Sequence, residues 1–309
     1  MQKRLFAIIG ICAVLLIVLR IRALQSSSAA GVQVQMIVTA EPKHGNDVPV
    51  LNREDVMVYQ GKDRDQVTGW EPFQGANANL ELFVLIDDSL STSVAQQLND
   101  VRSFINGQPP TASIGVAYMR NGTVQILQNL TTDHVAAAKS LRIPLGTSAS
   151  SSPYDSLVTL LKQWPAESKN RREVLMISNG VEPFGPATTS NPIVTSAVEA
   201  AQRAGVPVFT IYSAADGHFS HSFWRTTWAQ TYLSQLADET GGESYNFVNQ
   251  NISFTSYLQD IAQRLNRQYR LTFLAKPKNK SGIEQVRVTT EVPRVDLVAA
   301  DGVYVPAGM

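Results

Sequence analysis

The stretch LFVLIDDSLSTS, residues 82–93, joins a strand typical of a buried sheet to a cluster of oxygen-bearing side chains. Five apolar residues run directly into Asp87 and Asp88, and four hydroxyl side chains follow within the next five positions. Two adjacent carboxylates repel each other unless a positive charge lies nearby, and a buried strand offers them little water. The stretch therefore predicts a cation beside the end of this strand.

Asp87, Ser89 and Ser91 have the spacing D-x-S-x-S. Alternate residues of an extended turn point the same way, so one carboxylate and two hydroxyls can converge on one point. Such an oxygen-only set suits a hard dication, with Mg²⁺ favoured and Mn²⁺ or Ca²⁺ as alternatives. A second interpretation is that these side chains cap the following helix, because aspartate and serine are preferred there. Asp88 is expected to face solvent or a backbone amide.

The sequence beyond this stretch alternates buried strands with helices. Continuous apolar runs predict neighbouring parallel strands at the sheet centre over residues 82–86, 174–178 and 206–212. Apolar residues at helical spacing predict helices near 98–105, 154–164, 194–201, 228–236 and 254–265. The Asn121-Gly122 pair predicts a hairpin that makes one edge antiparallel. The fold class is therefore α/β, with a doubly wound, mostly parallel sheet and one antiparallel edge strand.

The two ends of the chain are rich in β-strand patterns. We divide the chain into an N-terminal β segment at 32–75, an α/β domain at 80–267 and a C-terminal β segment at 268–309. Neither end segment has enough strands for independent stability, so the two are predicted to pack together as a small sandwich.

Residues 1–30 differ from the rest of the chain. Lys3 and Arg4 precede a run of 15 apolar residues, 5–19, and a small-residue stretch follows. This pattern is typical of a secretory signal peptide. A retained membrane anchor over residues 5–22 is the alternative, because the flanking arginines can snorkel. We expect export to the periplasm or the cell exterior, with the leader either cleaved or kept as an anchor.

The composition excludes some partners. The 309 residues contain 26 Lys plus Arg and 26 Asp plus Glu, so no net field attracts nucleic acid. Apolar residues make up 44% and charged residues 17%, which is typical of a folded protein.

A buried strand ending in D-x-S-x-S, within this order of strands and helices, resembles the von Willebrand factor A (VWA) domain and its metal-ion-dependent adhesion site. The flanks LNREDVMVYQGKDRDQVTGWEPF (51–73) and QYRLTFLA (268–275) are similar to the ends of the acidobacterial-type VWFA-related secreted proteins of bacteria. The resemblance implies that Asp87, Ser89 and Ser91 hold a metal ion together with a threonine and a further aspartate.

The resemblance also indicates where those last two ligands lie. The segment SSSPYDSL, residues 150–157, puts Ser151 in place of the threonine, with Thr147 as a nearby alternative. The segment ISNG puts Asn179 where the family carries aspartate. Its amide oxygen can ligate the ion or orient a water molecule, but a negative charge is lost.

The segment DGHFSHSFW, residues 216–224, is predicted to be a loop at the same sheet edge. His218 and His221 have H-x-x-H spacing, but a zinc site needs three or four ligands and only Asp216 is added here. The two histidines are therefore solvated, packed, or in contact with a partner. Trp224 belongs either to a hydrophobic recognition patch or to the core of the loop.

Three functions remain to be weighed. The resemblance implies a non-enzymatic, adhesion-type module in which the ion captures a carboxylate of a protein partner. A metal-free structural scaffold in an envelope assembly is the alternative. A hydrolase using Asp87 or Asp88 is disfavoured, because adjacent strand residues point to opposite faces and cannot flank a scissile bond. The sequence also lacks a G-x-S-x-G elbow and a glycine-rich phosphate loop.

Overall fold

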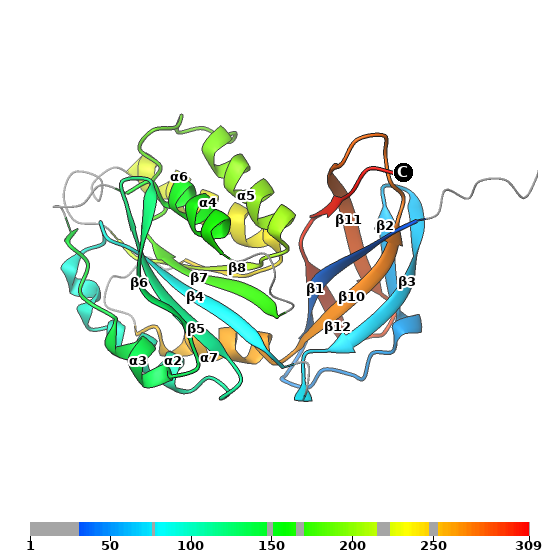
Figure 1. Cartoon of the computed structure of the whole chain (residues 1–309), viewed down its shortest axis with the longest axis horizontal. Coiled ribbons are helices and arrows are strands. Elements are labelled where there is room, and N and C mark those ends of the chain that lie inside the picture. The colour runs from blue at the N-terminus through cyan, green and yellow to red at the C-terminus, as the bar shows by residue number, and fades with distance from the viewer. Residues whose placement is uncertain are drawn as a thin grey trace, which may run out of the picture.

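The computed structural model describes residues 31–75, 78–146, 151–164, 170–214, 223–246 and 253–308. Within these residues the chain forms two units that lie side by side (Figure 1). One is a six-stranded sheet covered by helices, and the other is a seven-stranded antiparallel sheet.

The six-stranded sheet has the order β6-β5-β4-β7-β8-β9. Its strands are β4 (Leu80–Asp87), β5 (Ser113–Arg120), β6 (Thr123–Thr131), β7 (Arg171–Ser178), β8 (Val208–Tyr212) and β9 (Ser244–Tyr245). All neighbours are parallel except β5 and β6, so the sheet is mixed. The predicted adjacency of the three apolar strands is confirmed, because β7 lies between β4 and β8 and is parallel to both.

Helices cover both faces of this sheet (Figure 1). One face packs on α2 (Leu98–Asn106), α3 (His134–Lys139) and α7 (Thr255–Leu265), and the other packs on α4 (Pro153–Gln163), α5 (Pro192–Ala204) and α6 (Phe223–Thr240). Successive residues of β4 enter opposite cores: Leu82 and Val84 face α2 and α7, whereas Phe83 and Leu85 face α4 and α5. This burial on both faces explains why β4 is apolar without alternation.

The antiparallel edge begins at the predicted Asn121-Gly122 turn. Asn121 has φ 52° and Gly122 has φ 69°, so both residues lie in the left-handed region that a two-residue hairpin of type I′ requires. Strands β5 and β6 pair on either side of this turn, from Arg120 opposite Thr123 onward.

The second unit combines strands from both ends of the chain. Its order is β12-β1-β10-β3-β2-β11-β13. The strands are β1 (Val32–Pro42), β2 (Val56–Gln60), β3 (Asp63–Pro72), β10 (Gln268–Ala275), β11 (Gly282–Thr290), β12 (Val295–Ala299) and β13 (Gly302–Val305). The sequence predicted a sandwich here, and that detail is wrong. The seven strands form a single sheet that curls on itself (Figure 1). Side chains of β1, β2, β10, β11 and β13 meet in its one core.

One arginine ties the two units together. Arg264, near the end of α7, forms an ion pair with Glu41 of β1. Its other contacts are with Glu243 Oε2 at 3.0 Å and Asp260 Oδ2 at 2.8 Å, both in the α/β unit. The Arg264 side chain is largely buried, and burial lowers its pKa to about 10. This guanidinium therefore joins three acidic side chains at the junction.

Across the described part of the chain, none of the helices has both the length and the apolar character needed to cross a membrane. The leader predicted at residues 1–30 lies outside the described residues.

Candidate functional site

Asp87, the last residue of β4, is fully buried at the carboxyl edge of the six-stranded sheet. Its Oδ1 accepts hydrogen bonds from the Ser89 backbone N–H at 2.9 Å and from Ser89 Oγ at 2.7 Å. Its Oδ2 accepts from Ser178 Oγ at 2.8 Å. Among the described residues these partners are hydroxyls and an amide, and none of them is a cation.

Burial raises the pKa of the Asp87 carboxyl, and the hydrogen bonds from Ser89 and Ser178 oppose that rise. Ser151 also opposes it, which places its hydroxyl close to Asp87. Ser151 Oγ is buried and makes no hydrogen bond of acceptable geometry within the described residues. A buried carboxylate and a buried hydroxyl therefore lie close together at this edge of the sheet.

Ser91 caps a short helix instead of turning its hydroxyl fully toward Asp87. It is the N-cap of η3 (Thr92–Ala95), and its Oγ accepts from the Ser93 N–H at 3.2 Å and lies 2.8 Å from Ser93 Oγ. Its backbone N–H donates to the carbonyl of Ala214, in the segment after β8, at 3.1 Å. The capping interpretation therefore describes Ser91 in this arrangement.

Asn179 follows β7 and contacts Asp87 only through Ser89. Its Nδ2 donates to Ser89 Oγ at 2.9 Å, while its Oδ1 accepts from the Val181 N–H at 2.8 Å. Because Ser89 Oγ donates to Asp87, it has a lone pair left to accept from the amide. The result is a directed chain of hydrogen bonds from Asn179 through Ser89 to Asp87.

Asp88, unlike Asp87, is paired with a cation within the described residues. The Arg142 guanidinium binds its carboxylate with two parallel contacts, Nη1 to Oδ1 at 2.6 Å and Nη2 to Oδ2 at 2.9 Å, and the Leu145 N–H donates to Oδ1 at 3.1 Å. Asp88 therefore contacts a backbone amide, which is one of the two predicted environments. It does not face solvent, because it is fully buried.

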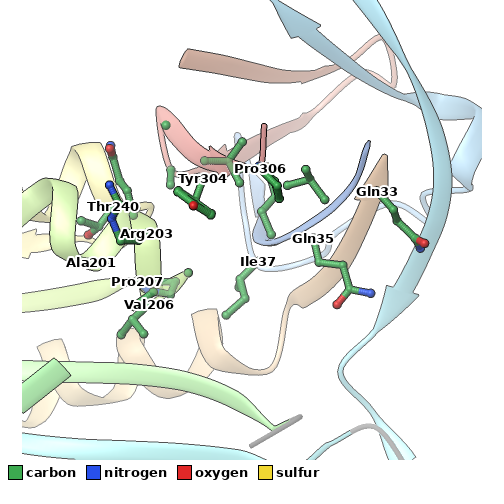
Figure 2. Close-up of a pocket in the computed structure, with 18 residues that line it drawn as sticks. Gln33, Gln35, Ile37, Ala201, Arg203, Val206, Pro207, Thr240, Tyr304 and Pro306 are labelled. Carbon is green, nitrogen blue, oxygen red and sulfur yellow. The ribbon is translucent and has the colours of Figure 1, made fainter. Parts of the chain in front are cut away.

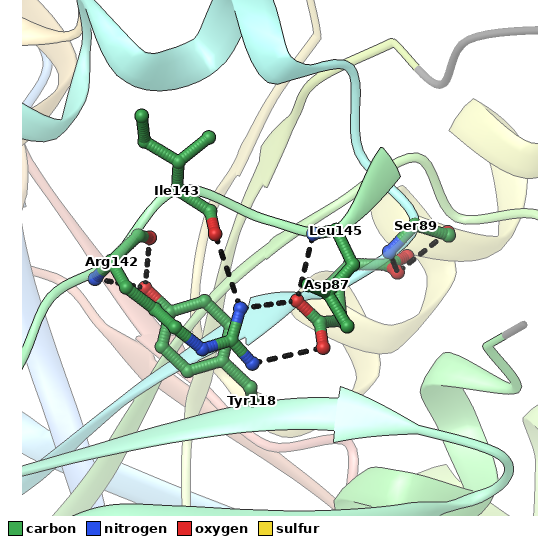
Figure 3. A network of polar contacts seen from close by, with 7 residues as sticks. Asp87, Ser89, Tyr118, Arg142, Ile143 and Leu145 are labelled. Carbon is green, nitrogen blue, oxygen red and sulfur yellow. Dashed lines mark hydrogen bonds and ion pairs between the residues drawn. The ribbon is translucent and has the colours of Figure 1, made fainter. Parts of the chain in front are cut away.

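The Arg142 guanidinium stacks over the ring of Tyr118 in β5 (Figure 3). The guanidinium carbon lies 4.0 Å from the ring centroid. The phenol accepts from the Arg142 backbone N–H at 2.9 Å and donates to the Arg142 carbonyl at 2.5 Å. Burial raises the pKa of Tyr118, and the hydrogen bond to Asp88 raises the pKa of Arg142. The segment 141–146 is thereby held against the sheet edge.

Large apolar side chains stand exposed on the segments around Asp87 and Asp88. Their exposed fractions are 52% for Ile143, 41% for Leu145, 70% for Phe184 and 72% for Trp224. We call these four residues the apolar rim. Of these four, Trp224 alone was predicted from the sequence as a recognition residue. Ile143 and Leu145 flank a proline in the segment RIPLG, and such apolar residues in a loop are the signal that could have identified them.

Some predicted site residues cannot be placed. His218, His221, Asp216 and Thr147 lie outside the described residues. Within the described residues, three or more His, Cys, Asp or Glu side chains nowhere gather closely enough to hold a metal ion. Any ion at Asp87 would therefore depend on one carboxylate and several neutral oxygens.

Comparison with known proteins gives similarities of structure only. No protein-family model matches the chain, and no curated protein matches it. Among solved structures, the conserved hypothetical protein BatB from Bacteroides thetaiotaomicron has a TM-score of 0.45 and 13% identity, covering 60% of this chain and 97% of its own. An aerotolerance-related membrane protein from Bacteroides fragilis NCTC 9343, with multiple mutations to serines, has a TM-score of 0.44 and 13% identity, with coverages of 61% and 99%.

The SpRpn10 VWA domain has a TM-score of 0.43 and 10% identity, covering 59% of this chain and 94% of its own. All three similarities are similarities of fold at low identity. The α/β fold of this chain is given by its own order of strands and helices.

Proposed function

We propose that the chain is a non-enzymatic protein-binding module that captures a partner at the carboxyl edge of the six-stranded sheet. The main support is the contrast between two adjacent, fully buried aspartates. Asp88 is neutralised by Arg142, whereas the described partners of Asp87 are all neutral. Burying an unpaired carboxylate is costly, and a bound dication at Asp87 removes that cost.

The donor set at Asp87 fits a hard cation. The proposed ligands are Asp87, Ser89, Ser91, Ser151 and Asn179, with Mg²⁺ favoured and Mn²⁺ or Ca²⁺ as alternatives. The buried hydroxyl of Ser151 supports this proposal, because it lies close to Asp87 without a hydrogen bond of good geometry, and a buried hydroxyl left unsatisfied costs about 1–3 kcal/mol. Ser91 and Asn179 now make hydrogen bonds within the protein, which ligation would replace. When bound, the ion supplies an open position for a carboxylate of the partner.

The apolar rim supplies the rest of the proposed contact surface. Exposed tryptophan and phenylalanine side chains beside a charged centre are the groups that dominate binding energy at protein interfaces. His218 and His221 lie outside the described residues, and we propose them as partner contacts from the sequence alone. We propose that the partner presents a carboxylate surrounded by apolar side chains.

The non-enzymatic assignment rests on the orientation of the two aspartates. Asp87 bonds to serines on β4–η3 and β7, whereas Asp88 bonds to Arg142 and Leu145. The two carboxylates therefore point into separate networks and do not form a pair around a substrate bond. The predicted leader at residues 1–30 supports export of this module, with or without retention as an anchor.

A metal-free scaffold is the second candidate function. The hydrogen bonds from Asn179 to Ser89 and from Ser89 to Asp87 satisfy these groups without an ion. The metal-dependent module should be stabilised by divalent ions, whereas the metal-free scaffold should not respond to them.

The first test replaces Asn179 by aspartate and follows thermal unfolding across a Mg²⁺ titration. An ion that binds only the folded state raises the melting temperature. Asn179→Asp should melt below the wild type in chelator, because it loses the donor to Ser89 and adds a carboxylate near Asp87. On addition of Mg²⁺, its melting temperature should rise more than that of the wild type. Its affinity for Mg²⁺ should be about tenfold higher, because desolvation removes most, but not all, of the added Coulomb attraction.

The matched control is Asn46→Asp, an exposed position in the seven-stranded unit with the same charge change. It should leave the Mg²⁺ response at the wild-type value. If neither the wild type nor Asn179→Asp responds to millimolar Mg²⁺, Mn²⁺ or Ca²⁺, the metal site is wrong and the metal-free scaffold remains.

The second test concerns the apolar rim. A pull-down with the wild-type protein should recover a partner in Mg²⁺ and lose it in chelator. The double variant Phe184→Ser/Trp224→Ser should reduce recovery about tenfold or more, since buried aromatic residues at interfaces are each worth about 2 kcal/mol or more. Val50→Ser is the control, because Val50 is 84% exposed on the other unit. Equal recovery by the double variant and the control would remove the apolar rim from the proposal.

A further inference from the structure

A groove lies where the curled sheet meets the α/β unit, at the start of β7, whereas the Asp87 site lies at the end of that strand. Its volume is about 560 Å³, within the range of small-ligand pockets. β1 contributes Met36 and Ile37, and three arginines also line it: Arg171, Arg172 and Arg270. The described residues that line this groove include neither aspartate nor glutamate. A second hollow of about 250 Å³ adjoins it along β1 and the end of α5 (Figure 2).

Two of the three guanidiniums share one aromatic ring. The guanidinium carbon of Arg171 lies 4.9 Å from the centroid of the Phe73 ring, and that of Arg270 lies 5.3 Å from it. Arg171 comes from β7 and Arg270 from β10, so the two units each bring one positive charge to this ring. Two like charges beside one ring add to the positive potential of the groove, which attracts an anion.

The acidic neighbours of these two arginines neutralise them only in part. Arg270 Nη1 lies 3.4 Å from Glu71 Oε2, and the Glu71 side chain is 56% exposed, so solvent screens the pair. Arg171 Nε lies 3.8 Å from Glu173 Oε1 without a hydrogen bond. Burial raises the pKa of Glu173 to about 7, so its carboxyl is partly protonated near neutral pH.

Arg172 has donors that the described protein groups do not use. Its Nη2 donates to the Ala204 carbonyl at the end of α5, at 2.6 Å, and its guanidinium carbon lies 5.9 Å from the Trp164 ring centroid. Glu81 is nearby, but its two oxygens accept from Trp164 Nε1 at 2.9 Å and Asn170 Nδ2 at 3.0 Å. A guanidinium carries five N–H donors in a planar fork, which matches carboxylate and phosphate oxygens.

We propose that this groove binds a small organic anion, with Arg270 and Arg172 holding a carboxylate or phosphate group. Phe73 and Ile37 contact the apolar body of that ligand. The ligand touches both units, so its binding stabilises their junction. This site is independent of the proposed metal at Asp87.

The experiment uses the full chain and three probes, which are phenyl phosphate, benzoate and inorganic phosphate. Isothermal titration calorimetry at low ionic strength should detect binding of at least one of the two aromatic anions, and added salt should weaken that binding. Tighter binding of phenyl phosphate or of benzoate identifies the headgroup. Inorganic phosphate should bind more weakly than phenyl phosphate, since it lacks the apolar body. Benzyl alcohol, which is neutral, should not bind.

Three variants test both the direction and the size of the expected change in affinity for the anion. Arg270→Gln and Arg172→Gln should each lower the affinity for the anion about tenfold or more, because each removes a charge-assisted hydrogen bond. Glu71→Gln should strengthen it several-fold by releasing Arg270 from its ion pair. Arg287→Gln is the matched control, an exposed arginine over Tyr59 on the same curled sheet but outside the groove.

The proposal is overturned if neither aromatic anion binds at about 10 mM. It is also overturned if binding persists unchanged in Arg270→Gln and Arg172→Gln, or if Arg287→Gln weakens it equally. Arg171 is left intact in these tests, because its Nη1 bonds to Leu265 and Gln268 and its loss would disturb the junction itself.

Discussion

Replacing Arg142 by alanine should lower the free energy of unfolding by about 3–5 kcal/mol, because it leaves a buried carboxylate without its counter-charge. Asp88 is fully buried, and both of its oxygens bind the Arg142 guanidinium. The same change removes the contact with the Tyr118 ring. Urea unfolding of the wild type and the variant, followed by circular dichroism, measures the difference.

The double variant Arg142→Met/Asp88→Asn separates the charge effect from lost packing. It removes both charges, so its stability should lie much closer to the wild type than that of Arg142→Ala. Arg102→Ala is the control, since Arg102 is also partly exposed and bonds to Asn99 and to the Leu141 carbonyl. A loss below about 1 kcal/mol in Arg142→Ala would show that water reaches Asp88 and that the pair is not a buried one.

Replacing Arg264 by alanine should cost about 2–4 kcal/mol and loosen the contact between the two units. Three acidic groups meet this guanidinium, and without it Glu41, Glu243 and Asp260 repel one another. Hydrogen exchange should rise in β1 and in the end of α7 more than in β4, because β4 is buried within its own unit.

Arg267→Ala provides the comparison, because Arg267 lies in the turn after α7 and its guanidinium bonds to neutral oxygens of Asn46 and Gln263 within the described residues. Adding Glu41→Gln to Arg264→Ala should recover part of the loss by removing one of the three charges. If Arg264→Ala and Arg267→Ala lose equal stability and exchange alike, the guanidinium does not hold the units together.

The sequence predicted the parts of the fold that depend on local patterns. The continuous apolar runs identified β4, β7 and β8, and Asn121-Gly122 identified the hairpin. The short helix α3, with the sequence HVAAAK, was missed because small residues give little periodic signal. The curled sheet was predicted as a sandwich, because whether a sheet closes over its own core depends on tertiary packing.

The candidate site was predictable to a similar extent. Period-two spacing identified Asp87 and Ser89 as neighbours, and their side chains do bond. No sequence pattern links Asp88 to Arg142, which lies 54 positions away. The orientation of Asn179 also depends on its environment, because its amide turns its nitrogen toward Ser89 to complete the hydrogen bonds there.

The position of β1 between β10 and β12 sets the order in which the molecule can assemble. A polypeptide is synthesised from its N-terminus, so β1 exists long before the two strands that pair with it. The helices and strands of the α/β unit, all encoded between β3 and β10, can fold in the meantime. During that interval both edges of β1 expose unpaired backbone groups, which makes the nascent chain vulnerable to aggregation. The curled sheet therefore closes last, as the final strands of the chain are added.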